Sequence, residues 1–270
     1  MDGRLRYAYA VVRPSPPLEP LLSGVRGVAD ASVELVGSGE LAAVVSSVPA
    51  EDFSEQALKE RLEDLDWLER VARAHHSVIE TLSDRTTVLP LRLATLYVDD
   101  AHVRLLLDER RQEFGRLLDR LADHVEWGVK VYAEPSPEAG RPETGAGTDL
   151  EAESSPGRAY LQRRREQRQA RDDVWRAAEL AVRRIADEAR ELAVEHVGHR
   201  LQQGTLASGP GDNVANDAYL VPRDLAEEFR TRVLRAADGL VGVRVEVTGP
   251  WAPYSFAEPA APDPREGAPP

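Results

Sequence analysis

Two pairs of histidines have the spacing that most resembles a metal site in this 270-residue chain. His75 and His76 are adjacent within a predicted helix, so their side chains point about 100° apart and converge poorly on one ion. His196 and His199 lie three residues apart near the end of another predicted helix, but a zinc site needs a third ligand and nothing in the sequence fixes one. The sequence therefore predicts no metal site and no cofactor. It leaves a metal- or small-molecule-binding site around His75 and His76 as the alternative.

Other signatures of catalysis are missing from the sequence. The chain has no glycine-rich phosphate loop, no G-x-S-x-G and no H-E-x-x-H. It has no cysteine, which excludes disulfides and thiolate chemistry. We therefore predict no catalytic residue and a non-enzymatic protein.

Arg92 and a C-terminal aromatic motif are the candidates for partner binding. Arg92 lies among apolar residues in LPLRLATLY, where an arginine faces an open sheet, pairs with a carboxylate or binds a partner. The motif VTGPWAPYSFAE (247–258) places Trp251, Tyr254 and Phe256 around two prolines in a chain with only 6% aromatic residues. Such rings fold back as a closing segment or anchor a partner. We favour the first interpretation and expect the motif to close the second domain.

Charge narrows the classes of partner. The formal net charge of −13 opposes binding to nucleic acid or to an anionic membrane lipid surface. The basic run RRREQRQAR (163–171) lacks the interleaved aromatics of a nucleic-acid site, so we interpret it as a solvated helix face, with an acidic protein surface as the next option. The first residues contain no apolar signal sequence, and no apolar run approaches the ~20 residues that span a bilayer. We expect a cytoplasmic protein.

Hydrophobic periodicity predicts the elements that position these residues. In the first half we expect a strand at 5–12, a hairpin around Gly37–Gly39, a helix from 54 to 83 that begins at a capping box of Asp52 and Glu55, a strand at 86–98, an amphipathic helix after Asp100 and a closing strand at 125–133. In the second half we expect a long helix from 157 to about 199, a strand at 218–222, a helix after Pro222 and a strand at 240–247.

Composition divides the chain into domains. Residues 134–157 are rich in Pro, Gly, Glu and Ser and read as a flexible acidic linker. We therefore predict an N-terminal domain at 1–133, this linker, a C-terminal domain at 158–256 and a disordered tail at 257–270. Residues 86–133 and 214–248 both read as strand, helix and strand. This similarity supports an α+β fold with two domains, each an antiparallel sheet with helices packed on one face.

Several stretches together resemble one known family. They are YAYAVV at 7–12, LAAVVSSVP at 41–49, ARAHHSVIETL at 72–82, TVLPLRLATLYVDDAHV at 87–103, EWGVKVYAE at 126–134, GRAYLQRR at 157–164, NDAYLV at 216–221 and VTGPWAPYSF at 247–256. In these stretches the chain resembles the gas vesicle protein GvpL/GvpF family over nearly its whole ordered length. After Arg92 the family usually has Phe-Gly, where this chain has Leu93-Ala94, and Ala252 replaces a proline of the family's closing motif.

The resemblance implies a non-enzymatic accessory or minor structural protein of gas vesicle assembly, located in the cytoplasm or at the gas vesicle. It implies contact with the small hydrophobic shell protein and with other gas vesicle accessory proteins. It also implies that the second domain is a modified ferredoxin-like one. The candidate contact residues are His75, His76 and Arg92 in the first domain, and Trp251, Tyr254 and Phe256 in the second. Whether the protein assists assembly or stays in the wall is left open by the sequence.

Overall fold

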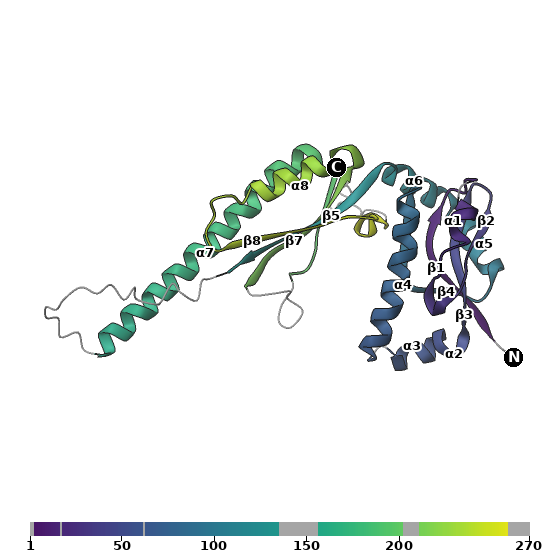
Figure 1. Ribbon diagram of the computed structural model, residues 1–270, viewed down its shortest axis with the longest axis horizontal. Helices are drawn as coiled ribbons and strands as arrows, with labels where there is room; N and C mark the ends of the chain where they lie inside the picture. Colours follow the sequence, from purple (N-terminus) through teal and green to yellow (C-terminus); the bar gives the residue numbers. More distant parts are fainter. Residues whose placement is uncertain (1–2, 17, 62, 135–155, 202–210, 259–270) are drawn as a thin grey trace, which may run out of the picture. The chain divides into compact units, whose positions relative to one another are not determined.

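The chain folds into two compact units (Figure 1). The computed structural model describes residues 3–16, 18–61, 63–134, 156–201 and 211–258. Unit 1 contains the chain up to Glu126 together with the segment from Pro250 onward, and unit 2 contains Trp127–Gly249. The α+β class with two four-stranded antiparallel sheets is confirmed.

Unit 1 is built on sheet 1, whose strand order is β2-β3-β1-β4. The strands are β1 (Arg4–Val12), β2 (Val33–Ser38), β3 (Leu41–Pro49) and β4 (Val88–Tyr97). The short helical segments between them are α1 (Leu18–Leu22), η1 (Val28–Asp30), α2 (Ala50–Phe53) and α3 (Glu55–Arg61). The expected hairpin joins β2 to β3, with Ser38 opposite Leu41. Gly39 in its turn adopts φ 62°, which glycine reaches without steric cost.

Helix α4 (Leu65–Ser83) packs against β1 and β4 and carries both histidines of the first pair. The prediction of one helix from 54 to 83 is wrong, because the chain forms α2, α3 and α4 in succession. Asp64 has extended backbone geometry and its carboxylate accepts the Trp67 N–H at 3.0 Å, so α4 begins there. Asp52 was the expected cap, but it forms an ion pair with Arg61 instead.

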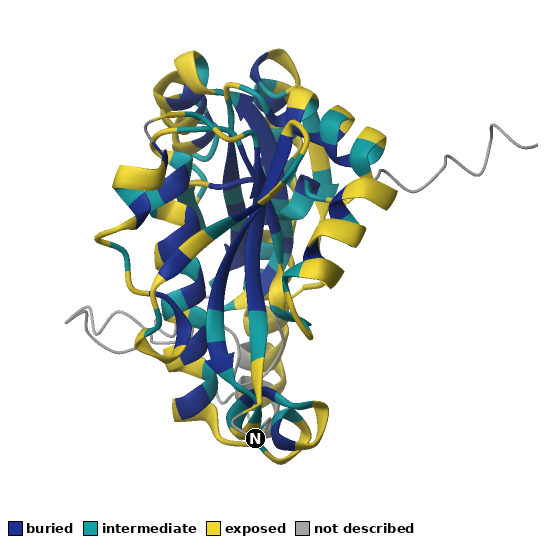
Figure 2. Ribbon diagram, turned by 90° about the vertical axis from the view of Figure 1, so that its right-hand side faces the viewer, coloured by how far each residue is buried: buried dark blue, intermediate teal, exposed yellow. Residues whose placement is uncertain are grey.

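Strand β1 is the centre of unit 1. Its last six residues, from Tyr7 to Val12, are all buried, so both faces of sheet 1 are covered here, and not one face as we expected. Helix α4 covers one face, while α5 (Asp100–Glu109) and α6 (Arg111–Leu121) pack against the strands from another side (Figure 1). Figure 2 shows the central strands as buried and the outer turns of the surrounding helices as exposed.

Strand β4 is an edge strand and is interrupted, as Pro90 led us to expect. Ala8 of β1 faces Thr95, whereas Ala10 faces Pro90, so residues 91–94 loop out of the ladder. We call residues 91–94 the β4 bulge. It contains Ala94 at φ 61°, a left-handed conformation that is unusual for a residue with a Cβ atom.

Unit 2 is built on sheet 2, in the order β6-β7-β5-β8. Its elements are β5 (His124–Ala133), α7 (Pro156–Leu192), β6 (Glu195–Gly198), β7 (Asp212–Pro222), η3 (Arg223–Leu225), α8 (Ala226–Arg235) and β8 (Val243–Trp251). Helices α7 and α8 run side by side along the sheet (Figure 1). The succession β-α-β-β-α-β is that of a ferredoxin-like unit. Sheet 1 has the same succession and an equivalent strand order.

The structure corrects three predictions about which elements belong together and where they end. Strand 125–133 was expected to close the first domain, but β5 lies in sheet 2. The similarity between 86–133 and 214–248 therefore aligns elements that are not equivalent, since β4 and β5 belong to different sheets while β7 and β8 share one. The long second-half helix ends at Leu192, and a short strand, β6, follows it. The predicted linker at 134–157 and tail at 257–270 lie almost wholly outside the described residues.

Candidate functional site

The aromatic motif folds onto unit 1, not onto unit 2 as we expected. We call residues 250–258 the closing segment; it begins with the last two residues of β8 and contains the short helix η4 (Tyr254–Phe256). The Trp251 ring meets the ring of His76 edge-on at 5.3 Å between centroids. The Tyr254 ring stacks on the same imidazole at 6.0 Å. The interpretation as a closing segment is thus correct in kind, but the part of the protein that it closes is the one that contains α4.

A buried carboxylate anchors the closing segment. Glu126 is only 9% exposed, and its two oxygens accept the backbone N–H and the hydroxyl of Ser255, each at 2.7 Å. Phe256 beside it is 1% exposed. Hydrogen bonds to a charged group of this kind are stronger than bonds between neutral groups. The segment is therefore fixed by a charged acceptor and a buried ring together.

His75 is buried and supports the β4 bulge. The Ala94 N–H donates to the Tyr7 hydroxyl at 3.1 Å, and the same hydroxyl is hydrogen-bonded to Nδ1 of His75, 3.0 Å away. The chain of hydrogen bonds ties helix α4 to the bulge through β1. His75 is consequently a positioning residue rather than a surface contact.

Burial lowers the pKa of His75 to about 4, from an ordinary value of 6.5. The Leu91 carbonyl opposes this shift, although Nε2 makes no hydrogen bond of normal geometry among the described residues. His76 lies in a different setting, against Trp251 and Tyr254. No cluster of three His, Asp or Glu side chains suited to a metal occurs in the part of the chain that the structure describes.

The β4 bulge presents Arg92 and Leu93 to solvent. The Arg92 side chain is 82% exposed and forms an ion pair with Glu258 at the end of the closing segment. Leu93 is 40% exposed, which is unusual for a leucine inside a β segment. The sequence had offered pairing with a carboxylate as one role for Arg92. The structure shows that pairing, at an exposed position rather than in a partly buried one.

A groove of about 410 Å³ lies beside β4, entirely within unit 1. Its apolar walls are formed by Leu89, Pro90, Leu91, Leu106, Phe114 and Ala257. Its polar groups are Arg92, Thr95, Tyr97, Arg110, Tyr254 and Glu258. We call this cavity the β4 groove. Arg92 and Tyr254, two of the residues chosen from the sequence, line this groove. His75 and Phe256 do not line it, but they hold the β4 bulge and the closing segment in place.

Several groove residues were missed by sequence reasoning. Leu106 and Phe114 belong to the apolar stripes of α5 and α6. Arg110 stands between these helices, forms an ion pair with Glu113 and lies over the Phe114 ring at 4.6 Å. Periodicity assigns such residues to a packed face, but it does not show where that face ends in a cavity. Glu258 ends the aromatic motif, but nothing in the sequence identified it as the partner of Arg92.

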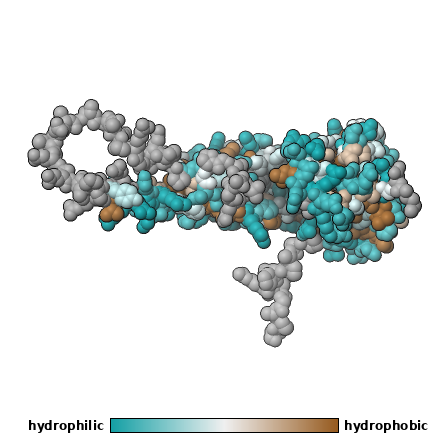
Figure 3. All heavy atoms as spheres, turned by 90° about the horizontal axis from the view of Figure 1, so that it is seen from below, coloured by the Kyte–Doolittle hydropathy of each residue, from teal (hydrophilic) through white to brown (hydrophobic). Residues whose placement is uncertain are grey.

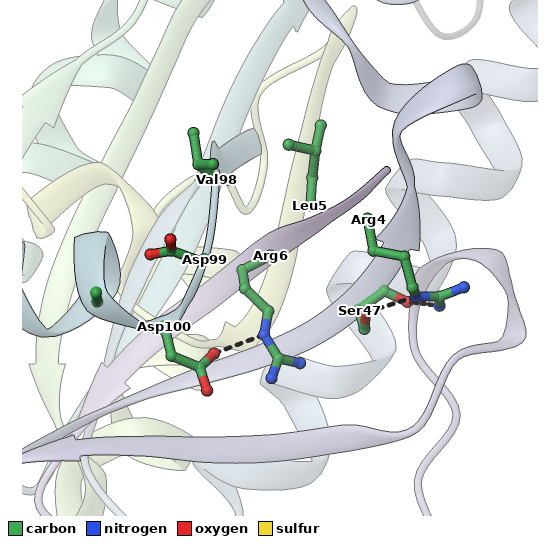
Figure 4. Close-up of a pocket in the computed structure, with 8 residues that line it drawn as sticks. Arg4, Leu5, Arg6, Ser47, Val98, Asp99 and Asp100 are labelled. Atoms are coloured by element: carbon green, nitrogen blue, oxygen red, sulfur yellow. Dashed lines mark hydrogen bonds and ion pairs between the residues drawn. The ribbon is translucent and has the colours of Figure 1, made fainter. Parts of the chain in front are cut away.

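A second cavity, of about 350 Å³, opens at the start of β1 (Figure 4). Its charged groups are already paired within the chain. Arg6 Nε lies 2.6 Å from a carboxylate oxygen of Asp100, and Arg4 donates to the Ser47 hydroxyl at 2.7 Å. The Arg6 and Asp100 side chains are 21% and 33% exposed, against 82% and 61% for the paired Arg92 and Glu258 at the β4 groove, so they are less available to a ligand and this cavity is the weaker candidate.

The second histidine pair and the basic run have ordinary structural roles. His196 lies on strand β6, not on a helix, with its ring 4.9 Å from that of Tyr219 and its Nε2 atom 3.0 Å from an Asp217 oxygen. The i, i+3 argument for His196 and His199 therefore does not apply. In α7 the side chains of residues 164–169 are exposed, which confirms the prediction of a solvated helix face for this part of the run.

The visible surface offers little contiguous apolar area. The face drawn in Figure 3 is mostly hydrophilic, and its hydrophobic residues form separate small areas. Among the described helices, none has the length and apolarity required to cross a membrane.

Fold and site together define a two-unit α+β protein with a groove closed by its C-terminal segment and with no recognisable catalytic constellation among the described residues. The family model described as "Gas vesicle synthesis protein GvpL/GvpF" matches residues 5–258, so the chain belongs to this family.

Known relatives and structures agree with this assignment. The chain is 46% identical over 263 residues to gas vesicle protein L of Streptomyces sp. (strain CB03234), covering 97% of this chain and 96% of the relative. It is 29% identical to gas vesicle protein F of the same strain, covering 93% of this chain and 99% of that one. The fold is similar to the crystal structure of GvpF from Anabaena sp. PCC7120, with a TM-score of 0.67 at 19% identity, over 96% and 98% of the two chains. For GvpF from Microcystis aeruginosa the TM-score is 0.64 at 18% identity, over 94% and 99%.

Proposed function

We propose that this protein is a non-enzymatic accessory or minor structural protein of gas vesicle assembly, and that it binds the small hydrophobic shell protein of the vesicle wall. Membership of the GvpL/GvpF family supports the role in gas vesicle assembly. The observation that supports shell-protein binding is the β4 groove, whose apolar walls are bordered by exposed charged groups.

The groove suits a segment of an apolar subunit. Leucine, proline and phenylalanine side chains form its walls, so an inserted apolar side chain would lose water contact on several sides. Arg92 and Glu258 at its border can donate to and accept from the backbone of the bound segment, which fixes its direction. The net charge of −13 would keep the complex in solution.

The six residues chosen from the sequence divide into two groups. Arg92, Tyr254 and the 37%-exposed Trp251 are accessible and are proposed as direct contacts. His75 and Phe256 are buried, and we assign them a supporting role. His76 connects the groups, because its ring lies against both Trp251 and Tyr254.

The test is co-expression of the tagged protein with the shell protein, followed by pull-down and crosslink mapping. We expect crosslinks to map to the β4 bulge and the closing segment. Arg92→Ala should reduce recovery of the shell protein severalfold without affecting folding, because an exposed ion pair contributes at most about 1 kcal/mol to stability. Arg73→Ala is the matched control, since Arg73 is also exposed and paired, in its case with Glu69.

A second matched pair tests the groove walls. Leu106 lines the groove, whereas its neighbour Leu105 is 53% exposed and does not. Leu106→Ser should abolish most of the recovered shell protein, and Leu105→Ser should leave it unchanged. Thermal unfolding of each variant verifies that it is folded. If the double variant of Arg92→Ala with Leu106→Ser still recovers the shell protein at the wild-type level, the groove is not the binding site.

The place of the protein in the assembly is a separate part of the proposal. We propose that it associates with gas vesicles and with other gas vesicle accessory proteins while the wall grows. Fractionation of isolated vesicles distinguishes two outcomes. Recovery only in the fraction outside the vesicles indicates an assembly factor, and stoichiometric retention in washed vesicles indicates a resident component of the wall.

A further inference from the structure

Within the part of the chain that the structure describes, strand β8 is a sheet edge without protection. In sheet 2 its neighbour is β5, and no other described strand pairs with its second side. The remaining edges are protected in the ways that proteins commonly use. Strand β4 carries Pro90 and the bulge, β6 has only four residues, and β2 has six residues and carries the exposed Glu34. Strand β8 has nine residues and no proline before Pro250.

The direction of its free backbone groups follows from one hydrogen bond. The Glu134 N–H donates to the Gly242 carbonyl at 2.8 Å, so that carbonyl points toward the end of β5. In a trans peptide the next N–H points the opposite way, so the Val243 N–H faces the free edge. Alternation along the strand then places the N–H and C=O groups of Val243, Val245 and Val247 on the free edge.

The side chains of β8 are self-complementary. Residues 243–248 read VRVEVT, and all six are half-buried. If a second copy pairs antiparallel with Val245 opposite Val245, each Arg244 faces a Glu246 and each Val243 faces a Val247. Val245 then forms a hydrogen-bonded pair, and Arg244 and Glu246 form non-hydrogen-bonded pairs, whose Cα atoms approach to about 4.5 Å. Opposite charges in such pairs stabilise a sheet.

The two faces of the strand fit this arrangement. The Arg244 guanidinium lies 3.9 Å from the centre of the Tyr132 ring and pairs with Glu134 and Glu246. It is therefore already held on one face of the sheet, within reach of a facing carboxylate. The valines lie on the opposite face and retain partial exposure, which pairing with a second strand would reduce.

We propose that β8 is a homodimerisation edge, at which two copies of this chain join their second sheets into one continuous eight-stranded antiparallel sheet. The occupant is a second copy because the strand's own sequence supplies the complementary charges. The pairing obeys a two-fold axis through Val245, as a closed symmetric dimer requires.

Sedimentation analysis of the full chain over a range of concentrations provides the first test. We expect a species with twice the monomer mass of 29.7 kDa. Val245→Pro removes an N–H that points to the free edge, so it should leave folding intact and return the protein to monomer. Glu246→Arg should raise the dimer dissociation constant about tenfold by opposing like charges, and adding Arg244→Glu should restore it.

Engineered cysteines test the register, because the chain has no native cysteine. Two Val245 residues in a hydrogen-bonded pair have Cα atoms about 5.5 Å apart, within disulfide range, so Val245→Cys should crosslink rapidly on mild oxidation. Thr248→Cys is the control on the same strand, since in this register two copies of Thr248 are about 20 Å apart.

Two results would overturn the proposal. One is a monomer at every concentration together with equal crosslinking of the two cysteine variants. The other is a dimer that persists unchanged in Val245→Pro, which would show that another surface joins the copies.

Discussion

The Glu126 carboxylate holds Ser255 by two hydrogen bonds of 2.7 Å, across 129 positions of sequence. Glu126 precedes the point where the chain leaves unit 1, and Ser255 follows the point where it returns. One carboxylate therefore holds these two distant parts of the chain together within unit 1. The same bonds place Tyr254 at the β4 groove.

The first prediction concerns this bond pair. Glu126→Gln removes the charge, and Ser255→Ala removes the hydroxyl but keeps the N–H donor. Bonds to a charged group contribute about 1.5–3 kcal/mol, so Glu126→Gln should loosen the closing segment more than Ser255→Ala does. Hydrogen exchange of the Ser255 amide measures the effect. We expect faster exchange in Glu126→Gln and a smaller change in Ser255→Ala; equal protection in all three proteins would contradict this.

The second prediction is a pH dependence of stability that originates at His75. Its folded-state pKa of about 4 lies below its ordinary value of 6.5. Between these values the unfolded chain binds a proton at this ring and the folded chain does not, so the free energy of unfolding falls as the pH is lowered through this range. The limiting slope is about 1.4 kcal/mol per pH unit. Above about pH 7 the group contributes no slope.

Denaturant unfolding between pH 8 and pH 4.5 measures this contribution. His75→Gln lowers stability overall but should remove this part of the slope. His76→Gln is the matched control, because it leaves His75 and its hydrogen bond to Tyr7 in place. Identical slopes for wild type and His75→Gln would show that the buried imidazole is not the source.

The third prediction concerns Ala94 in the β4 bulge. At φ 61° a residue with a Cβ atom is strained by about 1–2 kcal/mol, and glycine is not. Glycine also loses more entropy on folding, by about 0.4–1 kcal/mol. Ala94→Gly should therefore stabilise unit 1 by about 0.5–1 kcal/mol, measured as a rise in melting temperature. Ala101→Gly, in helix α5, is the control and should destabilise instead.

The sequence predicted features that depend on neighbouring residues better than features that depend on contacts between residues far apart in the chain. The alternation of apolar and polar residues located β1, β4, β5, β7 and β8, because this alternation is a property of neighbouring residues. The assignment of β5 to the first domain was wrong, because strand pairing joins residues that are distant in sequence. The short strand β6 was absorbed into the preceding helix, since four residues carry too little pattern to separate from a helix end.

The candidate site shows the same difference between local patterns and contacts that are distant in sequence. Arg92 and Tyr254 were chosen from the sequence as candidates in two different domains, since a charged residue in an apolar run and an aromatic cluster are visible locally; the structure places both at the β4 groove. Glu126 and Glu258, which fix the closing segment, were not selected. A carboxylate in a chain with 47 acidic residues carries no signal until the fold shows its partner.

The fourth prediction separates two candidate caps of the helices before His75. The sequence favoured Asp52, and the structure shows Asp64 accepting the Trp67 N–H. Asp64→Ala should lower the free energy of unfolding by about 1 kcal/mol, as loss of a helix cap does. Asp52→Ala removes only a part-exposed ion pair with Arg61 and should cost less. The reverse order in chemical denaturation would place the functional cap at Asp52.

The last prediction divides the aromatic rings of the closing segment by role. Phe256 is 1% exposed, so Phe256→Ala should cost about 3–5 kcal/mol through lost burial and the cavity left behind. Trp251 is 37% exposed and contacts His76 only edge-on, so Trp251→Ala should cost much less, about 1 kcal/mol. If Trp251 contacts the shell protein as proposed, its variant should lose binding while its melting temperature stays near that of the wild type. Equal losses of stability in the two variants would mean that both rings serve the fold, and that partner contact must be sought at Arg92 and the groove walls alone.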